Sequence, residues 1–124
     1  MAMLLTDEQN MLRDAARGFL QASAPIDQLR RLRDEASSDG DDRGTWKSMA
    51  EMGWSGVLIP EDHGGVAMGH VAAGVIAEEM GRTLTASPFL STAVMGAIAV
   101  AGYGSASQCE QWLSKIQDGT KKVA

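Results

Sequence analysis

The chain has little of what several protein classes depend on. It has one cysteine, Cys109, among 124 residues, which excludes an internal disulfide and a metal site built from cysteines. Basic residues are not in excess, since 11 Lys and Arg stand against 16 Asp and Glu, for a net charge of −5. Proteins that bind nucleic acid present a basic face, so this charge argues against that class. The two histidines, His63 and His70, have no recognisable ligand spacing, and we expect no metal site.

Long hydrophobic runs are also missing. Residues 83–109 contain no charged side chain, but their densely apolar part, residues 93–103, is far shorter than the roughly 20 residues that a bilayer span needs. The amino-terminal apolar start is brief and reaches Asp7 and Glu8 at once, unlike a signal peptide. The sequence therefore predicts a soluble, cytoplasmic protein with no membrane segment.

What is present indicates helices. Two capping boxes, Thr6 to Gln9 and Ser105 to Gln108, mark helix starts, and apolar residues recur at helical spacing between the Gly and Pro positions. The prediction is an all-α fold, roughly a six-helix orthogonal bundle. The helices are expected at residues 7 to 22–24, 25–32, 43–52, 69–80, 89–101 and 105–119.

Four of these helices have a clear apolar face that is expected to point inward. The residues on these faces are Met11, Leu12, Ala15, Ala16, Phe19 and Leu20 in the first helix, Trp46, Met49 and Ala50 in the third, Val71, Ala72, Val75, Ile76 and Met80 in the fourth, and Cys109, Trp112, Leu113 and Ile116 in the sixth.

One short apolar run interrupts the helices. Residues 54–60 are bounded by Gly53 and Pro60, and we expect an extended connection that places Val57 and Ile59 on one side and Leu58 on the other. The pair Gly64-Gly65 is expected to supply the positive φ of a tight reversal. A phosphate-binding loop is disfavoured, because two acidic residues precede these glycines and would repel an anion.

The fifth predicted helix, residues 89–101, is apolar or small on nearly every side. Such a helix must be covered all round, and five other helices of this length are not expected to cover it completely. Its small residues leave room for another backbone or an apolar ligand. A central core helix explains the same pattern equally well.

Three groups could carry chemistry, and each has a simpler structural explanation. Glu78 and Glu79 point about 100° apart on a helix, which suits pairing with Arg82, four residues after Glu78, better than a shared catalytic site. His63 has no identifiable nucleophile or orienting partner, so a surface loop position is expected. Cys109 lies on an apolar helix face and is expected to be a buried, inert thiol.

Three segments in order carry a resemblance to a known family. Residues 52–65, MGWSGVLIPEDHGG, resemble the GWxG(L/V)xxPExxGG segment of acyl-CoA dehydrogenases, residues 77–82, AEEMGR, are similar to the xEExGR helix end, and residues 112–119, WLSKIQDG, resemble the xxLPxLxxGE segment. Asp62-His63, Ser114 and Thr120 depart from these patterns. The resemblance implies the amino-terminal helical domain over residues 1–119, with residues 120–124 as the truncated start of the middle β-domain.

The resemblance also implies a function. The parent enzymes carry out α,β-dehydrogenation of acyl-CoA thioesters: a carboxylate removes the α-proton and a hydride passes from the β-carbon to FAD. Both that carboxylate and the flavin site belong to domains outside this chain, so the chain would be inactive alone. It would form one wall of the acyl-chain pocket in a homo-oligomer or mixed tetramer. The expected substrate-binding residues are Ser87, Pro88, Phe89, Leu90, Ser91, Thr92 and Met95.

Two other functions remain open at this point. The chain could be a stand-alone helical interaction module, or it could be a non-catalytic subunit of a heteromeric acyl-CoA dehydrogenase.

Overall fold

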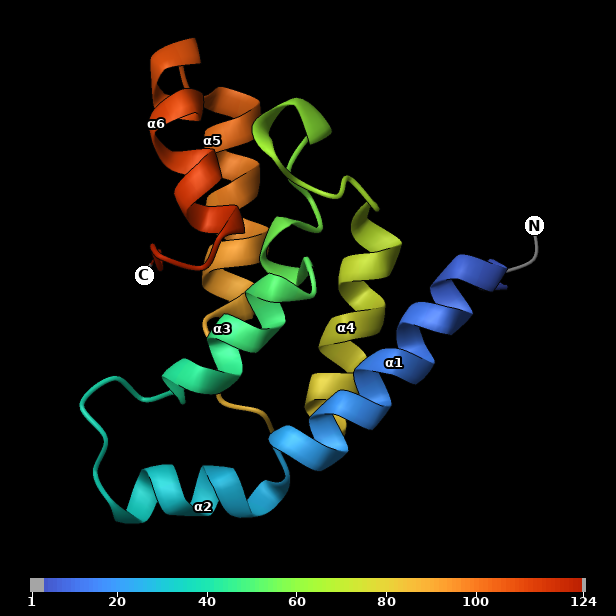
Figure 1. The fold of residues 1–124 in the computed structure, drawn as a ribbon, viewed down its shortest axis with the longest axis vertical. Helices are drawn as coiled ribbons and strands as arrows, with labels where there is room; N and C mark the ends of the chain where they lie inside the picture. The colour runs from blue at the N-terminus through green and yellow to red at the C-terminus, as the bar shows by residue number, and fades with distance from the viewer. Residues whose placement is uncertain (1–3, 124) are drawn as a thin grey trace.

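The computed structural model describes residues 4–123, and this part of the chain contains six α-helices and no strand (Figure 1). The predicted all-α fold is confirmed. The α-helices are α1 (Asp7–Ser23), α2 (Ile26–Asp34), α3 (Arg43–Glu51), α4 (His70–Arg82), α5 (Ala97–Tyr103) and α6 (Ala106–Gln117). Two 3-10 turns, η1 (Trp54–Gly56) and η2 (Glu61–His63), lie between α3 and α4, and a π-helix, η3 (Phe89–Gly96), runs directly into α5. None of the described helices is long and apolar enough to cross a bilayer.

The helix ends follow local sequence signals. Both predicted capping boxes form: the backbone N–H of Gln9 donates to Thr6 Oγ1 at 3.2 Å and that of Gln108 donates to Ser105 Oγ at 3.2 Å, and each glutamine side chain accepts from the cap residue's N–H in return. Helix α3 stops where Gly53 adopts a φ of +85°, a conformation that suits glycine.

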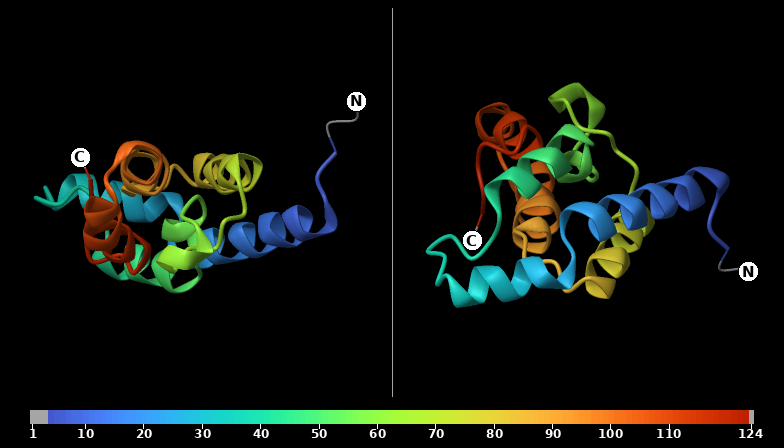
Figure 2. Two further views of the ribbon diagram at one scale, coloured as in Figure 1. Left: turned by 90° about the horizontal axis from the view of Figure 1, so that it is seen from above. Right: turned by 60° about the horizontal axis from the view of Figure 1, so that its bottom comes forward.

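Two apolar clusters hold the helices together. Helices α1 and α4 pack side by side, and α5 packs against α6 (Figures 1 and 2). The larger cluster joins α1, α3, α4 and η3 and includes an edge-to-face contact between Phe19 and Trp54, with ring centroids 5.5 Å apart. The smaller cluster consists of Ile59, Ala97, Cys109, Leu113 and Ile116. The fifth predicted helix, now η3 and α5, contributes to both clusters.

Four residues predicted to point inward are exposed instead. Met11 and Ala15 lie on the outer side of α1, Val71 is 56% exposed in the first turn of α4, and Trp112 is 38% exposed on α6. The amino-terminal turns of α1 extend away from the other helices (Figure 2), so the apolar pattern there has nothing to pack against. The ring of Trp112 lies at the surface with the Lys115 ammonium 5.4 Å from its centroid.

The predicted extended connection at residues 54–60 is wrong. The segment folds into successive tight turns, in which the N–H groups of Gly56, Val57 and Ile59 each donate to the carbonyl three residues earlier, at 3.1–3.3 Å. These turns bury Trp54 in the larger cluster and Ile59 in the smaller one. A short apolar run buried on all sides does not reveal its backbone conformation by periodicity, which explains the error.

The two glycines after this segment have different roles. Gly64 has a φ of +84°, as predicted for the reversal. Gly65 is needed for space, because a Cβ there would overlap the carbonyl group of Ile59. The carbonyl of Pro60 accepts from the N–H of Gly65 at 3.1 Å, and this tight fold returns the chain toward α4.

Candidate functional site

The structure does not place the predicted substrate-binding residues on one surface. Phe89 and Thr92 are buried, with 2% and 0% exposure, whereas Leu90 and Met95 are 64% and 63% exposed. Pro88 and Ser91 are half-buried. The expected incomplete cover of this apolar helix is therefore confirmed. Of the predicted residues, Ser87, Phe89 and Leu90 come together at one groove.

This groove, which we call the α4–η3 groove, has a volume of about 290 Å³. It lies between the carboxyl-terminal half of α4 and the linker to η3, and its walls are Ala77, Met80, Gly81, Leu84, Thr85, Ser87, Phe89 and Leu90. None of these side chains is charged, and most are apolar. The groove can therefore receive a hydrocarbon chain without leaving a charged group desolvated.

Sequence analysis missed the α4 wall of the groove. Ala77, Met80 and Gly81 follow one another at spacings of three and one residues, which places them on a single stripe of α4, and Leu84 follows in the linker after the helix end. Only Met80 had been assigned to the buried face. The small residues Ala77 and Gly81 in this stripe were the available signal, since they leave a hollow beside the larger Met80 and Leu84.

The linker that closes the groove is held by local contacts and carries backbone strain. The hydroxyl of Ser87 accepts from the N–H of Phe89 at 3.3 Å and donates to Met80 Sδ at 3.7 Å. Leu84 has a φ of +50°, a left-handed conformation that costs a residue with a Cβ about 1–2 kcal/mol. Strain of this kind persists only where surrounding contacts over-determine the backbone.

Thr92 and Met95 lie beyond the groove in η3. The π winding is shown by the N–H of Ala97, which donates to the carbonyl of Thr92 five residues earlier. Thr92 Oγ1 accepts from the N–H of Val123 at 2.9 Å, so this threonine contacts the tail after α6 and not the groove. The π-helix is a rare conformation, and where it occurs it is often found at functional sites.

The carboxylate pair on α4 has a structural role, and the partner differs from the predicted one. Arg82 Nε lies 3.2 Å from Glu79, not Glu78, and Arg17 of α1 makes two further hydrogen bonds to Glu79, at 2.9 and 3.1 Å. The hydrogen bond from Arg17 holds the pKa of Glu79 below its usual value despite burial. A paired carboxylate of lowered pKa is a poor proton acceptor, and Glu78 is exposed on the surface.

His63 and Cys109 were the two other candidates for chemistry. His63 ends the short turn η2 and is half-buried. The thiol of Cys109 is buried and donates to the carbonyl of Val100 at 3.2 Å. The predicted loop position of His63 and the predicted burial of Cys109 are confirmed.

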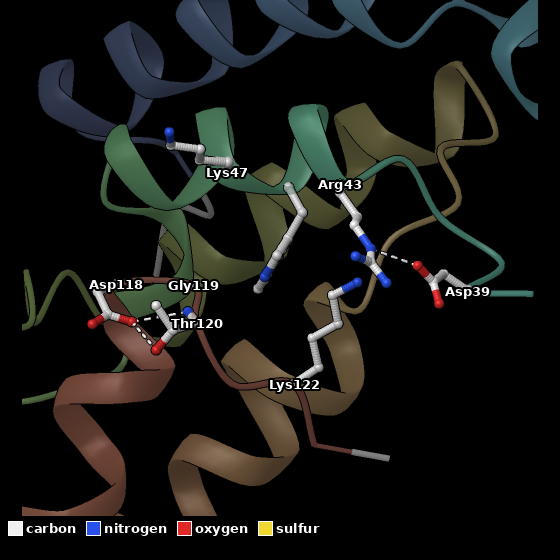
Figure 3. Close-up of a pocket in the computed structure, with 8 residues that line it drawn as sticks. Asp39, Arg43, Lys47, Asp118, Gly119, Thr120 and Lys122 are labelled. Carbon is white, nitrogen blue, oxygen red and sulfur yellow. Dashed lines mark hydrogen bonds and ion pairs between the residues drawn. The ribbon is translucent and has the colours of Figure 1, made fainter.

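A second pocket, of about 540 Å³, lies between α3 and the tail after α6 (Figure 3). Arg43 and Lys122 extend into it, and Arg43 is paired with Asp39 at 2.6 Å. On the opposite side Asp118 accepts from the hydroxyl of Thr120 at 2.6 Å. The cations on its wall are thus accompanied by carboxylates, and the pocket offers no strong preference for a charged ligand.

Comparison with known proteins decides the family. The sequence profile of the acyl-CoA dehydrogenase amino-terminal domain matches residues 6–120. The chain belongs to this family. The α4–η3 groove is therefore a feature of an acyl-CoA dehydrogenase amino-terminal domain, and the match favours this reading over a stand-alone interaction module.

The curated relatives are acyl-CoA dehydrogenases of mycobacteria. The chain is 26% identical to acyl-CoA dehydrogenase IpdE2 of Mycolicibacterium smegmatis over 117 residues, which cover 94% of this chain and 37% of the relative. It is 32% identical to acyl-CoA dehydrogenase FadE12 of Mycobacterium tuberculosis over 81 residues, covering 64% of this chain and 21% of the relative. The chain thus covers 37% of the length of the first curated relative and 21% of the second.

Solved structures show the same fold. A variant of the Tcur3481-Tcur3483 steroid ACAD superposes with a TM-score of 0.82 at 32% identity, over 94% of this chain and 31% of that one. An acyl-CoA dehydrogenase complexed with FAD from Bacillus anthracis gives a TM-score of 0.81 at 21% identity, over 96% of this chain and 20% of that one. The second likeness concerns the fold alone.

The described residues do not form a flavin site in this acyl-CoA dehydrogenase domain. The α4–η3 groove has a volume of about 290 Å³ and no cationic side chain to receive a pyrophosphate. The second pocket is larger, but its cations are accompanied by carboxylates.

Proposed function

We propose that this chain is the helical wall of the acyl pocket in an FAD-dependent acyl-CoA dehydrogenase. The observation that carries the proposal is the α4–η3 groove, an apolar hollow at the amino-terminal end of η3. Leu90 and Met95 of η3 are exposed in this chain. In this role the chain receives the acyl part of a thioester and excludes water from it. Assembly with flavin-binding domains, in a homo-oligomer or a mixed tetramer, would cover the exposed side of η3.

The groove's chemistry suits binding and not catalysis. Its polar groups are the hydroxyls of Thr85 and Ser87, and both are engaged locally, with Thr83 and with Met80 and Phe89 respectively. Of the two carboxylates between the groove residues Ala77 and Met80, Glu79 is occupied by two arginines and Glu78 is exposed on the surface. The base that removes the α-proton must therefore come from another part of the enzyme. FAD bound there would accept the hydride.

Leu90 is the residue best placed to test this role. It is 64% exposed and lines the groove, so a larger side chain there is expected to fill the groove without displacing a buried core residue. In the assembled enzyme that contains this domain, Leu90→Trp is expected to raise KM for long acyl-CoA substrates severalfold more than for short ones. Val71→Trp, a similarly exposed position at the other end of α4, is the matched control and should leave KM unchanged.

The substrate series should include two shapes. Straight-chain acyl-CoA thioesters of increasing length test the depth of the groove, and a steroid-bearing CoA thioester tests the class named for the Tcur3481-Tcur3483 relative. A change in preference between the two shapes on Leu90→Trp supports the acyl-pocket role. Identical kinetic constants for Leu90→Trp and the unmodified enzyme across the whole series would contradict it.

A further inference from the structure

The linker between α4 and η3 brings two hydroxyl-bearing side chains to the α4–η3 groove. Thr85 and Ser87 both line the groove, whereas Ala86 between them does not. Residues 85–87 belong to no helix, and alternate residues of extended backbone point to the same side of the chain. The linker therefore forms a wall of the groove that carries two hydroxyl groups among apolar neighbours.

The hydroxyl of Ser87 donates its proton to a weak acceptor. Its partner is Met80 Sδ at 3.7 Å, and a thioether sulfur accepts hydrogen bonds only weakly. The oxygen of the same hydroxyl accepts from the N–H of Phe89 at 3.3 Å, which holds Ser87 in position. A carbonyl or hydroxyl oxygen in the groove is a stronger acceptor than the sulfur, so it would take this proton from Met80.

The hydroxyl of Thr85 belongs to a pair that has a second proton to give. Thr83 Oγ1 and Thr85 Oγ1 are 2.7 Å apart, so one hydroxyl proton lies between them. Thr83 can also donate to the carbonyl of Met80, but at 3.5 Å, and that carbonyl already accepts from the N–H of Thr85 at 3.0 Å. When Thr83 donates to Thr85 instead, the proton of Thr85 is left for a group in the groove.

The walls of the groove select against charge. None of its eight lining side chains is charged, so a carboxylate placed there would lose its hydration without gaining an opposite charge. A plain hydrocarbon also has a cost, because it displaces water and leaves the two hydroxyls with weak acceptors. A neutral oxygen avoids both costs, since it loses less hydration than a charge and accepts the available protons.

We propose that the α4–η3 groove selects acyl groups that carry a neutral oxygen, as a keto or hydroxyl group, and that Ser87 and Thr85 are its specificity-determining residues. This inference rests on the proposed acyl-pocket function and names the class of acyl group. The oxygen accepts from Ser87 Oγ or Thr85 Oγ1, according to its place along the chain. The apolar walls contact the hydrocarbon part of the same acyl group.

Steady-state kinetics with matched substrates test this selection in the assembled enzyme that contains this domain. Each pair consists of a straight-chain acyl-CoA thioester and the analogue of equal length in which one methylene beyond the β-carbon is replaced by a keto group. The measured quantity is the ratio of kcat/KM for the keto analogue to kcat/KM for the plain chain. As the keto group is moved along the chain, we expect a position at which this ratio exceeds one, and the hydroxyl analogue should show the same preference.

Four variants assign the preference to the two hydroxyls. Ser87→Ala is expected to lower the ratio about five- to tenfold, the usual effect of one neutral hydrogen bond, and Thr85→Val should lower it at the same or a neighbouring position. Ser87→Thr keeps a hydroxyl and should retain the ratio. Ser114→Ala removes an exposed hydroxyl of α6 that does not line the groove, and as the matched control it should leave the ratio unchanged.

The ratio separates recognition of the oxygen from a structural role. An equal loss of kcat/KM for both substrates in Ser87→Ala would overturn the proposal, because Ser87 would then serve only to hold the start of η3. A ratio at or below one at every position in the unmodified enzyme would overturn it as well. If Leu90→Trp alters KM while Ser87→Ala and Thr85→Val leave the ratio unchanged, this inference fails and the acyl-pocket role stands. Unchanged kinetic constants in Leu90→Trp would instead contradict the acyl-pocket role itself.

Discussion

Arg17 of α1 and Glu79 of α4 form a two-pronged ion pair across the contact between their helices, with Arg17 Nη2 2.9 Å and Nε 3.1 Å from the two carboxylate oxygens. The Glu79 side chain is 1% exposed and that of Arg17 is 40% exposed. The charge that must be satisfied is therefore the carboxylate, and α1 supplies one of its two partners.

Glu79→Gln is expected to lower the free energy of unfolding by about 2 kcal/mol, somewhat below the cost of breaking a fully buried pair because both arginines reach solvent. The neutral amide keeps the volume but cannot satisfy both arginines. Urea denaturation measures the change. Glu78→Gln alters the neighbouring exposed carboxylate and should change the free energy by less than about 0.5 kcal/mol. Equal effects of the two variants would contradict the assignment.

The same carboxylate predicts a pH dependence. Hydrogen bonding from Arg17 lowers the pKa of Glu79 below 4.5 in the folded state, so protons bind the unfolded state more readily. The stabilisation from this group is complete above about pH 4.5 and is lost as the pH falls through the folded-state pKa. The difference in unfolding free energy between the unmodified chain and Glu79→Gln should therefore narrow in acid. A difference that stays constant from pH 6 to pH 3 would show that Glu79 does not titrate in this way.

Gly65→Ala and Gly74→Ala are expected to have opposite effects on stability. A Cβ at Gly65 would overlap the Ile59 carbonyl, whereas a Cβ at Gly74 on the exposed side of α4 meets nothing within 4 Å. The first variant should lose at least about 3 kcal/mol, because the backbone at Ile59 must move. The second should gain about 0.5–1 kcal/mol from helix propensity. Thermal melting followed by circular dichroism measures both, and a Gly65→Ala protein as stable as Gly74→Ala would refute the close contact.

Leu84→Gly should be more stable than Leu84→Ala by about 1 kcal/mol. Both variants remove the 57% exposed side chain, but only glycine adopts the observed φ of +50° without strain. Glycine also increases the conformational entropy of the unfolded chain, which lowers the stability of Leu84→Gly. This opposing effect keeps the difference between the two variants small. Chemical denaturation of both variants measures the difference in their free energies of unfolding, which reports the backbone strain at residue 84. If alanine were the more stable of the two, Leu84 would not be in the left-handed region.

The parts of the fold that local signals control could be predicted from the sequence. Thr6 and Ser105 each start a helix through contacts within four residues, and Gly53 ends one through its own backbone conformation. The conformation of residues 54–60 could not be predicted, because it is decided by two clusters that the segment joins. Trp54 and Ile59 are buried in different clusters, and no pattern within seven residues reports that.

The candidate site shows the same division. The stretch around Phe89 and Leu90 stood out as an uncharged apolar segment, and the structure places both residues at the groove. The hydroxyl of Thr92 is hydrogen-bonded to Val123, 31 residues away. Likewise the choice of Glu79 over Glu78 as the partner of Arg82 is decided by Arg17, 62 residues from Glu79. Partners this distant in sequence cannot be read from spacing along one helix.

The edge-to-face contact between Phe19 and Trp54 gives the domain an optical reporter of its own. Trp46 and Trp54 are 2% and 3% exposed, and Trp112 is 38% exposed. The two buried indoles should emit at short wavelength, and the third should be the one that soluble quenchers reach first. Since Phe19 belongs to α1, detachment of that helix alone would expose Trp54 to solvent and shift its fluorescence emission to longer wavelength. A spectrum therefore distinguishes detachment of the first helix from melting of the whole domain without any added label.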